Sequence, residues 1–328
     1  MASDIREIAS AEDYRNADIL SAGQFTQKGL TPLFDLADRM KLISRRLVKC
    51  RVLDSDVIGI NFFEESTRTR KSAETAGYRL GAMVSSMTEM KMSSMSKGET
   101  QEDTISVLSQ YSDLMVVRHP QEGFAETAAR YSTVPVINAG DGPAEHPTQA
   151  LLDMNTIRCR MGKIDDITVA MVGDLRYGRT VHSLTKLLSL HDNVKFRFIA
   201  PDIVKMPEEI LSTIRGRGLE VIETDDMTGG IADADVVYMT RVQQNRFPCV
   251  EDYQQVNGVY HLNRQVVTEK CKEGVVIMHP LPRVNELCPD VDSLPNNAYL
   301  GLDSQLEYGV LIKMALYLLI LGKAHKFV

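Results

Sequence analysis

Residues 62–70 carry the side chains with the clearest potential for chemistry in this sequence. They read Phe-Phe-Glu-Glu-Ser-Thr-Arg-Thr-Arg and follow an apolar, strand-like run at 57–61. A strand that ends in Ser66-Thr67-Arg68-Thr69 and turns into a helix places hydroxyl groups, a guanidinium and backbone N–H groups at the positive end of that helix. This combination predicts a phosphate site, since arginine can bind phosphate through two parallel hydrogen bonds. The alternative is an ordinary helix start, because serine and threonine are also preferred N-caps.

Other strand-like runs are also followed by polar residues that could bind an anion. Ligands of open parallel sheets bind outside the carboxyl ends of the strands, so the residues that follow each run are the ones to inspect. They include arginine, histidine and glutamine, in Arg118-His119-Pro120, His146-Pro147-Thr148-Gln149, Asp174 to Thr180, Arg241-Val242-Gln243 and His279 to Arg283. None of these segments carries paired carboxylates or a Ser-His-Asp set. We therefore expect a cleft for a substrate rich in negative charge.

The composition narrows the possible partners and compartments. The net charge of −7 argues against nonspecific binding of nucleic acid, which requires a basic surface. The five cysteines are odd in number and lack C-x-x-C spacing, which argues against a disulfide framework or a zinc site and favours reduced thiols in the cytoplasm. The first residues are polar, unlike a signal peptide, and no apolar run is long enough to span a membrane.

Apolar runs alternate with helical patterns over most of the 328 residues. Such alternation predicts βαβ units, and therefore an α/β fold with two doubly wound parallel-sheet domains joined by interdomain helices. We expect strands at 57–63, 114–118, 134–138, 167–173, 194–200, 219–223, 235–240 and 274–278. The expected domains are 1–150, completed by a returning C-terminal helix within 304–328, and 151–303. The methionines of 83–95 are interpreted as adaptable packing beneath a mobile loop.

Seven ordered motifs identify a family. They are Ser-Thr-Arg-Thr at 66–69, Lys-Gly-Glu-Thr at 97–100, Arg-His-Pro at 118–120, His-Pro-Thr-Gln at 146–149, Gly-Asp-Leu-Arg-Tyr-Gly-Arg-Thr at 173–180, Thr-Arg-Val-Gln at 240–243 and His-Pro-Leu-Pro-Arg at 279–283. From about residue 20 to residue 322 the chain resembles the carbamoyltransferases, and within them the aspartate carbamoyltransferases. The resemblance implies an enzyme that forms N-carbamoyl-L-aspartate and phosphate from carbamoyl phosphate and L-aspartate, in pyrimidine synthesis.

The resemblance also implies the residues that hold carbamoyl phosphate. Its phosphate would be held by Ser66, Thr67, Arg68 and Thr69. Its carbonyl oxygen would accept hydrogen bonds from Thr69, Arg118 and His146 as it gains negative charge, and such donors typically supply a few kcal/mol each. Gln149 would hold the carbamoyl amide, and Pro280 and Leu281 would lie against the same substrate. His146 is expected to donate a hydrogen bond rather than act as a base, because the departing phosphate can take the amine proton.

L-aspartate would be held by a second set of residues. The resemblance implies that Arg179 binds the α-carboxylate, that Arg241 and Gln243 bind the side-chain carboxylate, and that the Leu281 carbonyl accepts from the amine. Two carboxylates call for bidentate cations. His119 and His279, which also precede prolines, are interpreted as structural.

Further implications concern the assembly. In the family, the loop that carries Ser93 and Lys97 enters the site of a neighbouring subunit, which implies a homotrimer with shared active sites. Glu64 and Arg246 match residues that brace the two domains in the closed state. No cofactor or metal is expected. Regulatory subunits, or a larger pyrimidine-synthesis assembly, stay open as partners.

Departures from the family pattern and rival functions stay open at this point. Ala73 replaces a usual aromatic residue, Tyr299-Leu300-Gly301-Leu302 departs from the usual Tyr-Phe-x-Gln, and about three extra residues precede Lys313. Ornithine carbamoyltransferase has His-Cys-Leu-Pro, whereas residue 280 is proline. A dehydrogenase would need a G-x-G-x-x-G motif, which Gly173 and Gly178 do not make. A third alternative is an inactive structural paralogue within a larger pyrimidine-synthesis assembly, and the intact set of motifs argues against it.

Overall fold

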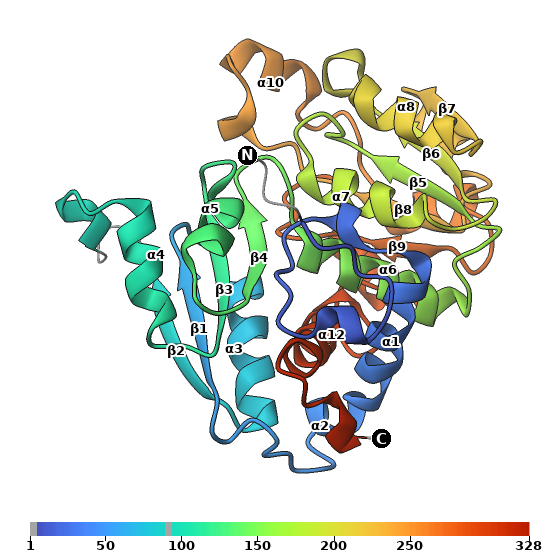
Figure 1. Cartoon of the computed structure of the whole chain (residues 1–328). Helices are drawn as coiled ribbons and strands as arrows, with labels where there is room; N and C mark the ends of the chain where they lie inside the picture. The colour runs from blue at the N-terminus through green and yellow to red at the C-terminus, as the bar shows by residue number, and fades with distance from the viewer. Residues whose placement is uncertain (1–4, 89–93, 328) are drawn as a thin grey trace. The chain divides into compact units, whose positions relative to one another are not determined.

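The computed structural model describes residues 5–88 and 94–327, and the chain divides into two compact units. The first comprises Met1–Leu152 and Leu306–Val328, and the second comprises Asp153–Gln305. The chain passes from one unit to the other within helices α6 (Pro147–Met161) and α12 (Gln305–Ile320), which Figure 1 shows in green and red. Each unit contains a parallel sheet with helices, so the predicted α/β fold with two parallel-sheet domains is confirmed.

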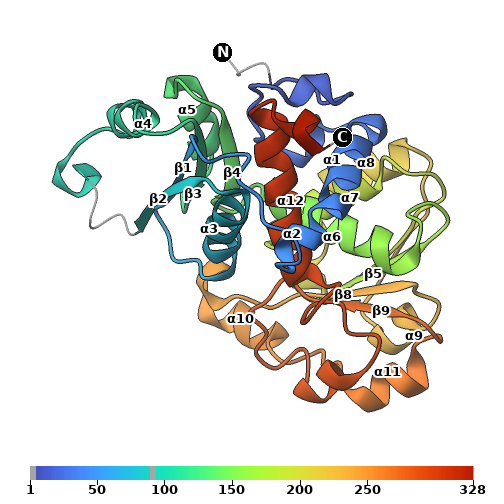
Figure 2. The same cartoon turned by 90° about the horizontal axis from the view of Figure 1, so that it is seen from below.

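The sheet of the first unit has the strand order β2-β1-β3-β4, and all its pairs are parallel. Its strands are β1 (Val57–Phe62), β2 (Met83–Thr88), β3 (Leu114–His119) and β4 (Val136–Asp141). Figure 2 shows α3 (Arg68–Leu80) on one face and α4 (Gln101–Ser109) and α5 (Phe124–Tyr131) on the other. Because both faces are covered, the central strands are almost continuous apolar runs, and Ile58 and Ile60 are fully buried.

The strand β2 was not predicted. The methionine-rich stretch 83–95 was interpreted as packing beneath a loop, but its first six residues pair along the whole of β1. At this edge Met83 is 54% exposed, whereas Met87 and the later Met95 pack against the buried cluster around Phe63. Methionine and serine carry little β-propensity, so a half-exposed edge strand made of them leaves no clear signal in the sequence.

The sheet of the second unit has the order β7-β6-β5-β8-β9 and is also entirely parallel. Its strands are β5 (Thr168–Val172), β6 (Lys195–Ile199), β7 (Val221–Thr224), β8 (Val236–Met239) and β9 (Val276–Met278). In Figure 2, α7 (Arg179–Leu188) and α8 (Glu208–Gly216) lie on one face, and α9 (Met227–Ile231) and α11 (Arg264–Lys270) on the other. Every residue of β5 is buried, which places the core of this unit at its central strand.

Other elements complete the two units. In the first unit these are η1 (Glu12–Tyr14), η2 (Ala22–Gln24), α1 (Gln27–Arg39), α2 (Lys41–Ser44), η4 (Ser94–Lys97) and η8 (Ala324–Phe327). In the second they are η5 (Asp202–Val204), η6 (Gln244–Arg246), α10 (Val250–Val256) and η7 (Pro289–Ser293).

Helix α12 is apolar on all sides and belongs to the core of the first unit, as expected for a helix surrounded by protein. The hydroxyl of Tyr317 donates to the carbonyl oxygen of Ala73 at 3.2 Å, and Glu307 pairs with Arg45 at 2.7 Å. Ala73 is fully buried, and its backbone carbonyl oxygen makes this contact between α3 and α12.

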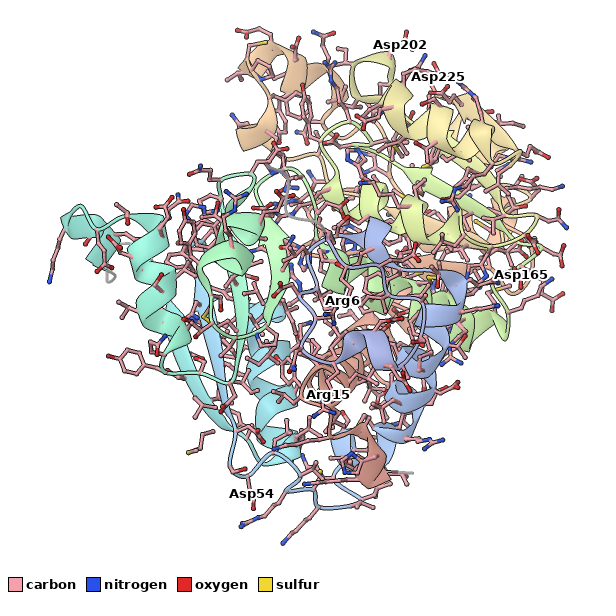
Figure 3. All side chains as sticks on the ribbon, in the orientation of Figure 1. Arg6, Arg15, Asp54, Asp165, Asp202 and Asp225 are labelled. Atoms are coloured by element: carbon pink, nitrogen blue, oxygen red, sulfur yellow. The ribbon has the colours of Figure 1, made fainter. Side chains whose placement is uncertain are left out.

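Charged side chains lie mainly at the surface. Arg6, Asp54 and Asp202, labelled in Figure 3, are exposed examples. Within residues 5–88 and 94–327, no helix combines the length and apolar character needed to cross a membrane.

Candidate active site

Both sheets place their chemically active residues at the same topological position. Strand order reverses between β1 and β3 in the first sheet and between β5 and β8 in the second. Ligands of open parallel sheets bind at such a reversal, outside the carboxyl ends of the strands. Residues 66–69 follow β1, Arg118 lies in β3, Arg179 follows β5, and Arg241 follows β8. Each unit thus carries its candidate residues where the topology favours a ligand.

The start of α3 is open to an anion. The helix begins at Arg68, and Thr67 occupies the N-cap position without making a side-chain capping bond. The N–H groups of the first turn are therefore not satisfied by the usual threonine cap, and the helix dipole adds positive potential there. Thr67 is exposed, while Ser66, Arg68 and Thr69 are half-buried beside it. This arrangement argues against the simple capped helix and suits an oxyanion.

Three predicted residues of the first unit meet around one imidazole. The Nε2 atom of His146 lies 3.5 Å from the Thr69 hydroxyl and 3.4 Å from Nη1 of Arg118. Arg118 also donates to the carbonyl oxygen of Ala139 at 3.1 Å and pairs with Glu64 at 2.6 Å. The structure thus brings Thr69, Arg118 and His146 together from α3, β3 and the residue before α6, although 28 and 77 positions separate His146 from the other two.

The protonation of His146 follows from its neighbours. A guanidinium can only donate, so the 3.4 Å approach of Arg118 favours an Nε2 without a proton, and a proton on Nδ1 would face the Thr148 hydroxyl at 3.3 Å. For His146 to donate from Nε2 to a ligand oxygen, as the sequence suggests, the ring must change tautomer or become an imidazolium. Thr148, fully buried, was missed by sequence reasoning, and its only signal was its position two residues after His146.

The other predicted residues of the first unit are placed differently. Gln149 is half-buried in the first turn of α6, where its N–H donates to the His146 carbonyl oxygen at 3.0 Å. Lys97 ends η4, is exposed, and has no hydrogen bond or ion pair with the cluster around His146 among the described residues. Figure 1 shows this segment projecting away from the sheet of its own unit. Ser93 lies outside the described residues.

In the second unit, Arg179 begins α7 and is only 6% exposed. The loop before it is held by Asp174, whose Oδ1 accepts the Tyr177 N–H at 2.9 Å, and by Arg246, which donates to the Tyr177 carbonyl oxygen. Burial raises the pKa of Asp174 above its ordinary value, although these hydrogen bonds and Arg246 oppose the shift. The loop thus fixes a buried guanidinium at a helix N-terminus.

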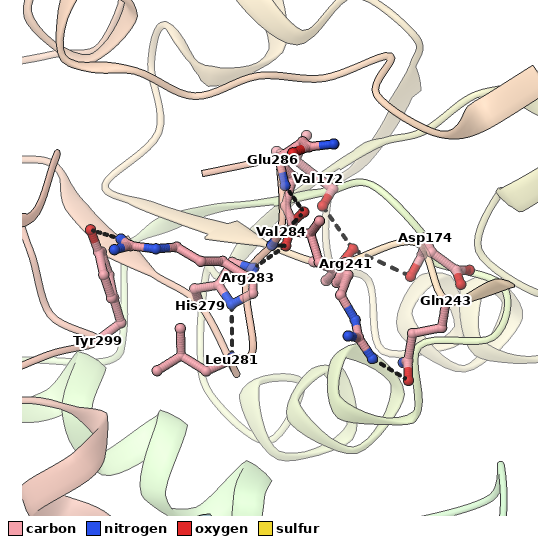
Figure 4. A network of polar contacts seen from close by, with 12 residues as sticks. Val172, Asp174, Arg241, Gln243, His279, Leu281, Arg283, Val284, Glu286 and Tyr299 are labelled. Atoms are coloured by element: carbon pink, nitrogen blue, oxygen red, sulfur yellow. Dashed lines mark hydrogen bonds and ion pairs between the residues drawn. The ribbon is translucent and has the colours of Figure 1, made fainter. Parts of the chain in front are cut away.

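Arg241 and Gln243 lie together on the loop after β8. Nη2 of Arg241 donates to Oε1 of Gln243 at 3.1 Å, a contact drawn in Figure 4. Both line an open pocket of about 620 Å³, whose wall also includes Phe247 and Tyr253. At the base of this loop a Cβ at Gly173 would lie 2.7 Å from the Thr240 carbonyl oxygen, so glycine allows the ends of β5 and β8 to approach. The pair can offer a cation and an amide to one carboxylate.

The segment after β9 holds Pro280 and Leu281 in a tight turn. Leu281 has a φ of 55°, and its N–H donates to Nδ1 of His279 at 2.7 Å. Nε2 of His279 lies 2.8 Å from Glu286. Glu286 was missed by sequence reasoning, since nothing in the motif shows which carboxylate would lie against the buried histidine. His119, in the first unit, stacks on Phe124 at 4.1 Å between ring centroids.

The geometry supports two half-sites of different character. The first unit offers a helix N-terminus, hydroxyl groups and two cations of α3 and β3, which fits a small dianion. The second offers Arg179, Arg241 and Gln243, which fits a dicarboxylate. Within the described part of the chain, no group of three or more histidine, cysteine, aspartate or glutamate residues is arranged to hold a metal ion.

Comparison with known proteins gives one consistent result. Residues 17–159 match the carbamoyl-P binding domain of aspartate/ornithine carbamoyltransferases, and residues 165–320 match their Asp/Orn binding domain. The chain is 44% identical, over 94% of its length and 99% of the relative's, to the aspartate carbamoyltransferase catalytic subunit of Thermoplasma acidophilum.

Solved structures agree in fold. The catalytic subunit of Methanocaldococcus jannaschii aspartate transcarbamoylase superposes with a TM-score of 0.85 at 41% identity, covering 94% of this chain and 99% of that one. Aspartate transcarbamoylase from Trypanosoma cruzi, in complex with carbamoyl phosphate and aspartate, superposes with a TM-score of 0.88 at 35% identity, covering 96% of this chain and 100% of that one.

Proposed function

Because this chain belongs to the aspartate/ornithine carbamoyltransferase family, we propose that it transfers the carbamoyl group of carbamoyl phosphate to the amine of L-aspartate. The products would be N-carbamoyl-L-aspartate and phosphate, as in an early step of pyrimidine synthesis. The observation that carries the choice of second substrate is the Arg241–Gln243 pair on an open pocket, because it suits a carboxylate and not a cationic side chain.

Carbamoyl phosphate is assigned to the first unit. Its phosphate would lie at the uncapped start of α3, on Ser66, Thr67, Arg68 and Thr69, and its carbonyl oxygen near Thr69, Arg118 and His146. Arg118 would then exchange part of its pairing with Glu64 for the ligand. Gln149 would hold the carbamoyl amide. Donors fixed in this way stabilise charge that develops on the oxygen in the transition state.

L-aspartate is assigned to the second unit. Arg179 would bind the α-carboxylate and Arg241 with Gln243 the side-chain carboxylate, while the Leu281 carbonyl oxygen would accept from the amine. The amine lone pair would attack the carbamoyl carbon and form the C–N bond. The C–O bond to phosphate would then break, and the departing phosphate would take a proton from the nitrogen. Pro280 and Leu281 would also contact carbamoyl phosphate.

The test is an assay of the purified protein with carbamoyl phosphate and L-aspartate, in which carbamoyl aspartate and phosphate are both measured. Matched reactions with L-ornithine separate the two activities of the family. We expect product with aspartate and none above background with ornithine. Ornithine turnover at a comparable rate, or no product with either amine, would refute the proposal.

We further propose that the enzyme is cytoplasmic and that it forms a homotrimer. In this trimer, Lys97 and Ser93 would complete the active site of a neighbouring subunit. The support for the trimer is that Lys97 is exposed on a segment that projects away from the sheet of its own unit. Among the described residues, Lys97 makes no hydrogen bond or ion pair with the cluster around His146 of its own chain. Mixing an inactive Lys97→Ala chain with an inactive Arg68→Ala chain should restore part of the activity. Mixed trimers without any recovery would show that each chain builds its own site.

The brace between the domains is a separate proposal. Glu64 and Arg246 already hold partners within their own units, namely Arg118 and the Tyr177 carbonyl oxygen. Closure around both substrates would use these residues to exclude water from the reaction.

A further inference from the structure

The imidazole of His279 is held in a single protonation state by its two neighbours. His279 follows β9 and is 1% exposed. Its Nδ1 accepts the Leu281 N–H at 2.7 Å, and its Nε2 lies 2.8 Å from Oε1 of Glu286, as Figure 4 shows in part. A backbone N–H can only donate, so Nδ1 carries no proton and Nε2–H donates to the carboxylate. The ring is therefore neutral and fixed as the Nε2–H tautomer.

Glu286 is suited to select this tautomer. Its carboxylate also accepts the N–H groups of Val284, at 3.2 Å, and Asn285, at 3.1 Å. Burial tends to raise the pKa of Glu286, but the hydrogen bonds from His279 and the backbone, together with the attraction of the His279 ring whenever it is protonated, outweigh burial and lower it. An ionised carboxylate at neutral pH can only accept, so it requires a proton on the facing ring nitrogen.

Leu281 needs such support because its backbone is strained. Its φ of 55° lies in the left-handed region, which costs a residue with a Cβ about 1–2 kcal/mol. Strained residues of this kind persist where the surrounding structure fixes them, and they cluster at functional sites. Within this turn, the hydrogen bond from Leu281 N–H to Nδ1 of His279 restrains the backbone of Leu281.

The backbone of His279 is fixed in turn by a buried chain of polar groups. Its N–H donates to Oε1 of Gln305 at 2.9 Å, and Nε2 of Gln305 donates to Asp153 at 2.5 Å. The Tyr238 hydroxyl donates to the other oxygen of Asp153 at 2.7 Å. Asp153 is fully buried and Gln305 is 4% exposed, so this support is shielded from water.

We propose that His279, oriented by Glu286, is a positioning residue: its neutral ring holds Leu281 in the left-handed conformation that directs the Leu281 carbonyl oxygen toward the aspartate amine. The inference rests on the proposed function, in which that oxygen accepts from the amine. Correct orientation of the attacking lone pair affects the chemical step, so loss of this support should lower kcat more than it weakens binding of carbamoyl phosphate, whose phosphate is assigned to the other unit.

Two substitutions separate the two ring nitrogens. The amide oxygen in His279→Asn can replace Nδ1 as the acceptor for Leu281, whereas the longer side chain in His279→Gln can reach Glu286 but offers no acceptor at the Nδ1 position. We expect the glutamine variant to lose about tenfold to a hundredfold in kcat. The asparagine variant should keep most of kcat, and in the glutamine variant KM for carbamoyl phosphate should change by a smaller factor than kcat. Equal losses in both variants, or a larger loss with asparagine, would overturn the proposal.

A second measurement does not depend on catalysis. Nitrogen-15 NMR of the histidine rings in the parental protein, assigned with the His279→Asn spectrum, should show a neutral Nε2–H ring for His279 from pH 6 to pH 8. An Nδ1–H ring or an imidazolium at pH 7 would overturn the proposal. Lack of carbamoyl aspartate formation by the parental protein would refute the proposed function itself, whereas an active parent with equally active variants would refute only the positioning role.

Discussion

Two His-Pro turns, one in each unit, share one local device and differ in what surrounds it. In both, Nδ1 of the histidine accepts the N–H of the residue two positions on: Gln121 at 3.0 Å in the first unit and Leu281 at 2.7 Å in the second. The other face of His119 stacks on Phe124, whereas the other nitrogen of His279 donates to Glu286. The same motif thus packs its ring against an aromatic side chain in one unit and donates to a carboxylate in the other.

The position of the proposed chemistry relative to each turn differs as well. In the first unit the assigned residue, Arg118, precedes the histidine and lies within β3, so the strand itself holds it. In the second, the assigned residue, Leu281, follows the histidine and lies in the turn, so only the turn holds it. Substitutions at the two histidines should therefore differ in kind: stability in the first unit and turnover in the second.

The largest effect is expected for Arg118→Ala. The guanidinium approaches His146 and pairs with Glu64, so its loss removes a donor to the developing oxyanion. We expect kcat to fall about 10²–10³-fold, the usual cost of one such donor. Steady-state kinetics at saturating aspartate is the measurement, and Arg51→Ala, at an exposed residue of the same unit, is the control. A variant within tenfold of the parental rate would show that the strand before the first turn does not carry the chemistry.

The units also differ in how they bury a charged group, and Lys313→Met tests this difference. Asp153 of the second unit accepts from two side chains, whereas Lys313, 2% exposed in α12, donates to the Gly309 carbonyl oxygen at 3.1 Å. Burial lowers the pKa of Lys313 from 10.5 to about 7. The unfolded chain thus binds more protons between these values, so this residue makes stability rise with pH from about 7 to 10.5, and its destabilising effect is complete below pH 7.

Replacement by methionine should remove that penalty and raise the free energy of unfolding near pH 7 by up to about 4 kcal/mol, with little gain above pH 10. Urea titrations of both proteins at pH 6.5, 8 and 9.5 measure the difference. Lys326→Met, at an exposed residue, is the control for loss of one charge. An equal gain at all three pH values would show that Lys313 is not neutral in the folded protein.

A smaller effect is expected for Arg241→Lys in the second unit. Lysine keeps the charge but loses the planar fork that binds a carboxylate through two hydrogen bonds. We expect KM for aspartate to rise about tenfold, while KM for carbamoyl phosphate stays the same. Arg215→Lys, in a surface ion pair with Glu208 at 2.8 Å, serves as the control. A change in both KM values would indicate that the two half-sites are not specialised.

The smallest effect is expected at the first turn, for His119→Gln. Burial lowers the pKa of His119 from 6.5 to about 4, so the parental protein should lose stability as the pH falls from 6.5 toward 4. The variant should unfold about 1 kcal/mol more easily at pH 7.5, lose less of its stability on acidification, and retain its turnover. Thermal unfolding at pH 7.5 and pH 5 with parallel assays checks this. A tenfold loss of kcat in this variant would contradict the prediction that His119 affects stability and His279 affects turnover.

The sequence predicted the sheets well because both faces of the central strands are buried. Continuous runs such as 167–173 and 235–240 stand out for that reason, and the structure places β5 and β8 within them. The edge strand β2 was not predicted, because its exposed methionines and serines do not form a continuous apolar run. The short helix α10 was also missed, since seven largely polar residues after Pro248 give too few apolar positions to define a period.

The candidate site was predictable to a different degree. Residues at strand ends could be named from the sequence, because parallel topology brings the ends to one edge of a sheet. The partners that orient them could not, because neither the place of Thr148 in the His-Pro-Thr-Gln motif nor the sequence around Glu286 shows that these side chains lie near a ring nitrogen. The tautomer of His279 depends on such a partner, so it could not be predicted from the sequence either.

The discontinuous first unit has a consequence for biosynthesis. Helix α12 supplies buried residues such as Leu311, Met314 and Tyr317 to a unit whose strands end at residue 141, yet the ribosome makes it only after nearly all of the second unit. The second unit can complete its core during translation, whereas the first must wait with an apolar face uncovered. The nascent chain should therefore depend most on chaperones during the interval between residues 152 and 306.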